Sequence, residues 1–414
     1  MLDICGRQLT ASAPGIFVVA LGKAARPMAL GLEESLGTMI TAGVVTGPPV
    51  RGEPLDTSRW QTFEGGHPLP NTASLAAARA AFELLDHANK EQAIVIFLIS
   101  GGGSAMIEWP INEDISLDDL RSANRTLVAC GASINEINSV RRCFSSVKGG
   151  GLARRATRSE MISLIISDTN SGDEASVASG PTISPPANAP GAAEVIRRYR
   201  LEDLLPTSIL QAAIQSENRH SALAHVNSPH YVLLDNQTAL EGAARKAAAL
   251  GFTVEIAADV CEQEIESGSE MLLSRLDSSA SSSPPERDVS LLSGGEFSCP
   301  VRGDGKGGRN LETALRCAIK LNQNHKETGS HTVVLSAGTD GTDGNSPAAG
   351  GIADETTIQR ATALGMDAMR YLERSDSHGF FERLGNLVMT GPTGTNVRDL
   401  RVMIRSRAGS TANR

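Results

Sequence analysis

The residues best suited to chemistry lie in seven polar segments broken by glycine, each following a short apolar run. They read LISGGGSA (98–105), SVKGGGLA (146–153), LIISDTNSGDEASVASGPT (164–182), LLSGGE (291–296), RGDGKGGRN (302–310), LSAGTDGTDG (335–344) and MTGPTGTNVRDL (389–400). Glycine lets backbone N–H groups approach a ligand closely, and the start of the next helix carries partial positive charge. Seven such segments indicate a protein that holds phosphate oxygens.

The first two candidates follow apolar runs in the N-terminal part of the chain. Lys23 lies directly after the run 16–20 and opens a helix, a position that points into the crevice where open α/β sheets bind ligands. The other interpretation is a solvated lysine at a helix start. The phosphate-binding candidates are Ser100, Gly101, Gly102, Gly103 and Ser104. Tight packing of a strand against a helix would also explain these glycines, and no GxxxxGK[ST] loop occurs anywhere.

A third candidate is a polar face. Asn138, Arg141, Ser145 and Lys148 are spaced by three, four and three positions, so on a helix they would share one side. Lys148 is followed by Gly149, and such a face could meet an anion. A solvated surface is the alternative.

Carboxylates follow two further runs. Asp168 and Asp173 come after the run 161–167 and could bind Mg²⁺, directly or through water, or cap the next helix. Asp340 and Asp343 follow the run 332–336. They could bind Mg²⁺ or orient a substrate hydroxyl, or they could form an Asx-turn. The loop lacks the spacing and the final Glu of an EF-hand.

The segment GDGKGG (303–308) satisfies GxGxxG and supports a second hypothesis, a nicotinamide-dependent reductase. Pro300 precedes it, which a central parallel strand would not tolerate. No acidic residue follows at the place where a ribose contact is required. Arg309 instead presents a fork of N–H donors that could hold a γ-phosphate.

The elements that must position these residues alternate between short apolar runs and longer alanine-rich amphipathic segments. We expect strands at 16–20, 93–99, 161–167, 230–234, 252–257, 288–293, 332–336 and 386–390. We expect helices at 24–36, 74–89, 117–130, 191–199, 238–250, 262–276, 310–322 and 355–364. Strands that are apolar throughout are typical of a parallel sheet covered on both faces. The proline-rich stretch 183–191 should be irregular, 277–287 should be a mobile surface loop, and a domain boundary should lie near 222–229.

Composition narrows the classes of function. The chain has 414 residues, enough for two domains, and a net charge of −9 without a long basic block, which argues against nucleic acid as a partner. No apolar stretch approaches the roughly 20 residues of a membrane span, and no signal peptide is visible. The six cysteines form no CxxC pair, as expected of free thiols in the cytoplasm. No HExxH or GxSxG motif is present.

The ordered set of motifs resembles the class II D-glycerate 2-kinases, whose C-terminal half is the MOFRL domain. The matching segments are ALGKAARPMA (20–29), GGHPLP (65–70), SGGGSA (100–105), GASINEINSVRRCFSSVKGG (131–150), ASGPT (178–182), SGGE (293–296), GGRNLE (307–312), AGTDGTDG (337–344), AAGG (348–351) and TGPTGTNVRDL (390–400). They cover the chain from about residue 16 to about residue 404.

The resemblance implies two α/β domains with the active site in the cleft between them. Residues 1–224 would form a Rossmann-like parallel-sheet domain and residues 225–414 a mixed-sheet MOFRL domain. The implied reaction is ATP-dependent phosphorylation of D-glycerate at its 2-hydroxyl, which gives 2-phosphoglycerate and ADP.

The resemblance also implies roles for single residues. Lys23, Arg309 and Asp340 would be catalytic, Mg²⁺ would be held near Asp168 or Asp340, and ATP would be bound by the segment 100–104 with Lys148 and Gly149. Where the family has arginine after its KGG, this chain has Gly151, so that role would be lost or would move to Arg142 or Arg154. Asn71 stands in place of an aspartate, and a helical leader found in family members is expected to be missing. An NAD(P)H-dependent hydroxypyruvate reductase and a non-catalytic metabolite-binding relative are the alternatives, and a cytoplasmic homodimer is the expected assembly.

Overall fold

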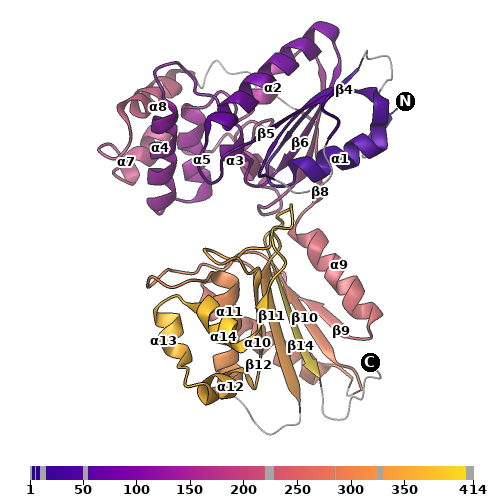
Figure 1. Cartoon of the computed structure of the whole chain (residues 1–414), viewed down its shortest axis with the longest axis vertical. Coiled ribbons are helices and arrows are strands. Elements are labelled where there is room, and N and C mark those ends of the chain that lie inside the picture. The colour runs from indigo at the N-terminus through magenta and orange to yellow at the C-terminus, as the bar shows by residue number, and fades with distance from the viewer. Residues whose placement is uncertain are drawn as a thin grey trace. The chain divides into compact units, whose positions relative to one another are not determined.

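The computed structural model describes residues 2–4, 6–9, 15–49, 55–219, 228–284, 286–323 and 330–406. The chain divides into two compact units, Met1–Leu233 and Leu234–Arg414 (Figure 1). The expected domain boundary at residues 224/225 lies outside the described residues. Within the described ranges, no helix combines the length and the apolar character needed to cross a bilayer.

Unit 1 is built on a six-stranded sheet. Its strands are β3 (Ile16–Leu21), β4 (Ile40–Gly47), β5 (Trp60–Glu64), β6 (Ile94–Ser100), β7 (Glu160–Ile166) and β8 (His230–Leu234). The order across the sheet is β5-β4-β3-β6-β7-β8, and the β3–β4, β3–β6, β4–β5 and β6–β7 pairs are parallel. This is the strand order of doubly wound nucleotide-binding sheets, in which ligands bind where the order reverses. That point lies between β3 and β6, so the loops after these two strands are the ones to examine.

Alternate residues of the strands pack against helices on opposite faces. Phe17 and Val19 pack with α2 (Thr72–Glu91), whereas Val18 and Ala20 pack with α1 (Ala25–Leu36). Figure 1 shows both helices alongside the sheet. Because both faces are covered there, the central strands β3 and β6 are buried throughout and almost entirely apolar, and the sequence revealed them for that reason.

A separate helical cluster packs beside this sheet. Its helices are α4 (Leu117–Ala129), α5 (Ile134–Cys143), α7 (Ala192–Arg198) and α8 (Thr207–Arg219), which share one apolar core. Three shorter elements of unit 1 follow strands or loops, namely α3 (Gly103–Met106), α6 (Gly151–Arg155) and the 3-10 segment η2 (Glu174–Ser179). A two-stranded antiparallel ribbon, β1 (Leu2–Ile4) and β2 (Arg7–Leu9), and the 3-10 turn η1 (Gly37–Met39) complete the described elements of unit 1.

Unit 2 has a mixed sheet in the order β13-β12-β11-β14-β10-β9. The strands are β9 (Thr253–Ile256), β10 (Val289–Ser293), β11 (His331–Gly338), β12 (Gly350–Asp354), β13 (Leu387–Val388) and β14 (Asp399–Ser406). Only β9 and β10 are parallel among the described pairs. The helices are α9 (Asn236–Ala249), α10 (Ile265–Ser282), α11 (Arg309–Gln323), α12 (Thr357–Ala363), α13 (Ala368–Glu373) and α14 (Ser377–Leu384). Residues of α10 and α11 share a core with β10, β11 and β14, and α12, α13 and α14 pack against α11.

Two expectations about local structure are wrong. Residues 277–282 are not a loop, since α10 continues through this serine-rich stretch to Ser282. The face of Asn138, Arg141, Ser145 and Lys148 is not a single helix face either, because α5 ends at Cys143. The proline-rich stretch 183–191 is irregular, as predicted.

Candidate active site

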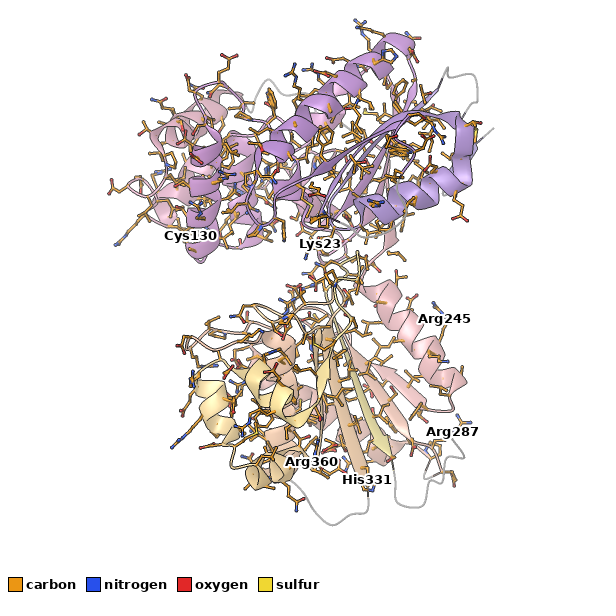
Figure 2. The ribbon with its side chains drawn as sticks, in the orientation of Figure 1. Lys23, Cys130, Arg245, Arg287, His331 and Arg360 are labelled. Atoms are coloured by element: carbon orange, nitrogen blue, oxygen red, sulfur yellow. The ribbon has the colours of Figure 1, made fainter. Side chains whose placement is uncertain are left out.

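The turn after β3 is locked to the end of β6. Gly22 adopts a left-handed φ of 106°, and a Cβ there would stand 2.3 Å from the carbonyl oxygen of Ser100. The backbone N–H of Lys23 donates to the carbonyl of Gly101 at 2.8 Å, and that of Ala24 donates to Ser100 Oγ at 2.9 Å. The buried hydroxyl of Ser100 therefore holds the turn that carries Lys23. Figure 2 labels Lys23 at this edge of the unit 1 sheet.

Three polar side chains lie against the glycine loop after β6. A Cβ on Gly102 would stand 3.2 Å from Lys23 Cγ and 3.5 Å from His67 Cε1, and one on Gly101 would stand 1.9 Å from Asp168 Oδ2. The loop is thus glycine because Lys23, His67 and Asp168 lie against it. His67 was not among the predicted site residues, although its place in GGHPLP was a usable signal.

Ser104, the last predicted residue of this loop, leads into a chain of hydrogen bonds. Its Oγ lies 2.8 Å from Ser179 Oγ, which donates to Asn138 Oδ1 at 2.8 Å. Gly103 has a different reason to be glycine, because a Cβ there would stand 2.5 Å from Leu21 Cδ1 and 2.9 Å from Ala178 Cβ. Gly103 is therefore a packing position, and Ser104 is the partly exposed side chain of the loop.

Lys148 lies in the core of unit 1. Its side chain and that of Glu108 are both 1% exposed and form an ion pair, and Glu108 also accepts from Ser145 Oγ. Burial lowers the pKa of Lys148, partly offset by the charge of Glu108. The structure thus gives Lys148 a buried carboxylate partner, and its contact with a nucleotide stays a prediction. Gly149 has a backbone role, since its N–H donates to the carbonyl of Ser179 at 3.0 Å.

In unit 2, Arg309 is held by two carboxylates. Its Nε and Nη2 donate to the two carboxylate oxygens of Asp399 at 2.7 and 3.0 Å, and Nη2 lies 2.8 Å from Glu296 Oε1. Asp399 is fully buried, and these charges raise the pKa of Arg309 above its ordinary value despite partial burial. Burial also raises the pKa of Glu296. The guanidinium is therefore permanently charged and fixed in direction.

The two aspartates of the DGTDG segment have different roles. Asp343 is buried and accepts from the backbone N–H groups of Asn310 at 3.0 Å and Leu311 at 2.8 Å, at the start of α11. Burial raises its pKa to about 6. Asp340 accepts from the backbone N–H and hydroxyl of Thr342 at 3.2 and 3.3 Å, an Asx-turn arrangement. Asp343 therefore orders the start of the helix that carries Arg309.

The GDGKGG segment does not have the context of a dinucleotide fingerprint. Strand β10 ends at Ser293, and residues 294–308, all described, contain no strand. A Cβ on Gly303 would stand 2.8 Å from the backbone of Arg374, and one on Gly305 would stand 2.5 Å from the carbonyl oxygen of Arg374. These glycines allow close packing on the turn between α13 and α14, so the reductase hypothesis loses its main support.

Within the part of the chain that the structure describes, no three His, Cys, Asp or Glu side chains come together as a metal site. Asp168 and Asp340, the two predicted metal ligands, belong to different units. Five cysteines (Cys130, Cys143, Cys261, Cys299 and Cys317) carry free thiols, as expected, and Cys5 lies outside the described residues.

Two family models match the chain. One, described as a domain of unknown function (DUF4147), matches residues 5–213, and the other, the MOFRL family, matches residues 289–399. A D-glycerate 2-kinase of Thermotoga maritima is 36% identical over 388 residues, which are 93% of this chain and 89% of that protein. A glycerate 2-kinase of Pyrococcus horikoshii is 34% identical over 96% of this chain and 89% of its own length. The chain belongs to the glycerate 2-kinase family.

Structural comparison agrees with this family assignment. The crystal structure of the Thermotoga maritima glycerate kinase has a TM-score of 0.79 and 34% identity, and covers 94% of this chain and 91% of its own. A putative hydroxypyruvate reductase of Agrobacterium vitis is also 34% identical, over 94% of this chain and 86% of that protein. Lys23 and the glycine loop lie in the region that the DUF4147 model matches. Arg309 and Asp399 lie in the region that the MOFRL model matches. The parallel sheet of unit 1 and the mixed sheet of unit 2 confirm the predicted fold class.

Proposed function

We propose that this protein transfers the γ-phosphoryl group of ATP to the 2-hydroxyl of D-glycerate, which gives 2-phosphoglycerate and ADP. The observation that carries the proposal is the convergence of Lys23, His67 and Asp168 on the glycine loop at the point where the strand order of unit 1 reverses. Doubly wound sheets bind phosphorylated ligands at this point. The names of the relatives support glycerate as the acceptor.

Phosphoryl transfer asks a protein mainly for positioning and for neutralisation of charge. The backbone N–H of Lys23 donates to Gly101 and that of the next residue, Ala24, donates to Ser100 Oγ, so the turn that carries the Lys23 side chain is fixed. We assign to the Lys23 ammonium the role of neutralising the negative charge that develops on the phosphoryl group during transfer. The small residues Gly101 and Gly102 let phosphate oxygens approach the backbone of the loop.

The residues present fit a Mg²⁺ ion that accompanies ATP. Magnesium in such sites takes one or two protein carboxylates, and substrate phosphates and water supply the other ligands. The Asp168 carboxylate occupies the space that a side chain at Gly101 would fill, directly over the proposed phosphate loop. Asp168 would hold the ion, which when bound neutralises charge on the polyphosphate. Asp340 is the other candidate for this ion, and its Oδ1 accepts two hydrogen bonds from Thr342.

Arg309 is the proposed second cation of the transfer. Two of its three nitrogens are used by Asp399 and Glu296, and Nη1 has no hydrogen-bond partner among the described residues. The carboxylates aim the guanidinium, and the remaining N–H groups can meet a phosphate oxygen.

A coupled assay with ATP, Mg²⁺ and D-glycerate, followed by determination of which hydroxyl is phosphorylated, tests the proposal. We expect Lys23→Ala to lower kcat by about 10²-fold or more, because one charge on the transition state is lost. Lys90→Ala, at an exposed lysine in the last turn of α2, is the matched control and should leave kcat unchanged. Turnover of Lys23→Ala within a few-fold of the parent would show that Lys23 is not catalytic.

The same preparation distinguishes the alternatives. Oxidation of NAD(P)H with hydroxypyruvate, without ADP release, would establish the reductase. Binding of ATP or glycerate without turnover would establish a metabolite-binding relative. The cytoplasmic location and the homodimer stay predictions.

A further inference from the structure

The segment that follows Asp168 contains a strained turn. Ala178 and Ser179 have positive φ angles of 51° and 63°, and Gly180 follows at 63°. L-residues with a Cβ rarely adopt this conformation, and two in a row persist only where the surroundings hold them. Both are buried, and Ser179 is held by its hydrogen bonds to Ser104 and Asn138. Such strain is often found where a side chain must be aimed.

The hydrogen bonds of this turn have a defined direction. In the orientation that the structure gives the Asn138 amide, Oδ1 faces Ser179 and can only accept, so Ser179 donates its single hydroxyl proton to it over 2.8 Å; Nδ2 of the same amide is buried and has no hydrogen-bond partner among the described residues. Ser179 then has no proton left for Ser104. The 2.8 Å contact between the two hydroxyls must therefore be a donation from Ser104 to Ser179. The proton of Ser104 is committed, and its oxygen presents only lone pairs to the glycine loop.

This polarity decides what Ser104 can bind. A phosphate or carboxylate oxygen brings lone pairs of its own and would be repelled, whereas a hydroxyl group can donate. Ser104 is partly exposed on the loop that carries Gly102, against which Lys23 and His67 lie. The expected role of Ser104 as a phosphate ligand does not agree with this direction.

The chain also cannot take up a proton, because it ends on a neutral amide oxygen, Asn138 Oδ1. A hydroxyl that attacks phosphorus must lose its proton, so Ser104 is unsuited to hold it. A hydroxyl that stays protonated through the reaction suits it.

We propose that Ser104 Oγ accepts a hydrogen bond from the non-reacting 3-hydroxyl of glycerate, and that Ser179 and Asn138 are positioning residues that fix its polarity. The inference rests on the proposed function and adds a determinant of specificity to it. Acids that lack the 3-hydroxyl would leave Ser104 without a donor, and a site built for a hydroxyl discriminates against such analogues.

The test compares D-glycerate with D-lactate, which has methyl in place of the hydroxymethyl group. The measured quantity is the ratio of kcat/KM for the two acids; if turnover of lactate is too slow, its inhibition constant against glycerate replaces kcat/KM. We expect Ser104→Ala to lower the preference for glycerate by about 3- to 10-fold, as for the loss of one neutral hydrogen bond. The change should come from a lower kcat/KM for glycerate, and the value for lactate should stay the same. Asn138→Ala should act in the same direction because it frees the proton of Ser179.

Asn135→Ala is the matched control. Asn135 lies one turn earlier on α5 and accepts from Ser176 Oγ at 2.7 Å, so it holds the same segment without touching Ser104 or Ser179. It should leave the preference unchanged. Two results would overturn the assignment and leave the kinase activity established. One is an unchanged ratio of kcat/KM for glycerate and lactate in Ser104→Ala. The other is an equal loss of kcat/KM for both acids in Ser104→Ala and Asn138→Ala. A parent protein that phosphorylates neither acid would overturn the proposed function and this inference with it.

Discussion

Removal of the charge of Lys148 should destabilise unit 1 and leave nucleotide affinity unchanged. Lys148 and Glu108 are each 1% exposed, and they pair with one another in the core. Replacing Lys148 by Met removes the ion pair and leaves the carboxylate of Glu108 with two neutral donors, Ser145 Oγ and the backbone N–H of Trp109, and with the charge of Arg141 nearby. Breaking a buried pair in this way typically costs about 3–5 kcal/mol.

A variant with both residues changed distinguishes an interacting Lys148–Glu108 pair from two residues that act independently. Glu108→Gln alone should cost a similar amount, because it leaves a buried ammonium without its anion. If the two residues acted independently, the two costs would add. We expect Glu108→Gln with Lys148→Met to cost about as much as one single change, which is a coupling energy of roughly 3 kcal/mol.

The assay can follow unit 1 by itself. Both tryptophans of the chain, Trp60 and Trp109, lie in this unit, so their fluorescence during urea unfolding reports on it selectively. Equal m-values would show that the free energies of unfolding can be compared. Costs that add, or a Lys148→Met variant of normal stability with a strongly raised KM for ATP, would refute the buried-pair interpretation and restore Lys148 as a nucleotide ligand.

The sequence predicted the strands that are buried on both faces of a sheet. The strands β3, β6 and β10 are buried throughout and β7 is buried after its first two residues, and each was visible as an apolar run. Strands β1, β2, β4, β5, β12 and β14 were missed. In β14, for example, the buried alternate positions include the charged Asp399 and Arg401, whereas the apolar Leu400 and Val402 between them are partly exposed, and Arg401 lies over the ring of Phe297. Tertiary partners decide the conformation of such a strand.

The site could be predicted where local geometry imposes a residue type. Gly22, Gly101 and Gly102 are required by close approach of other groups, so Lys23 and its loop could be found from glycine spacing and strand ends. The partners of Lys148 and Arg309 could not. Glu108 precedes Lys148 by 40 positions, and Asp399 follows Arg309 by 90, and no local pattern links residues so far apart.

Two further predictions concern unit 2. Arg309→Lys should lower kcat by about 10²-fold or more and raise the KM for glycerate much less, because lysine cannot reproduce the fork held by Asp399. Arg245→Lys, at an exposed position on α9, is the control. A near-parental kcat of Arg309→Lys would refute a role for the fork. The second uses Asp343, whose pKa is raised from 3.8 to about 6. A raised carboxyl pKa favours the protonated form in the fold, so its contribution to stability is full below pH 4 and is lost as the pH rises through 6, by at most about 3 kcal/mol. Asp343→Asn mimics the protonated group, and circular dichroism should therefore show the variant gaining stability relative to the parent between pH 4 and pH 7; a difference that does not change with pH would mean that Asp343 is ionised in the folded protein at an ordinary pKa.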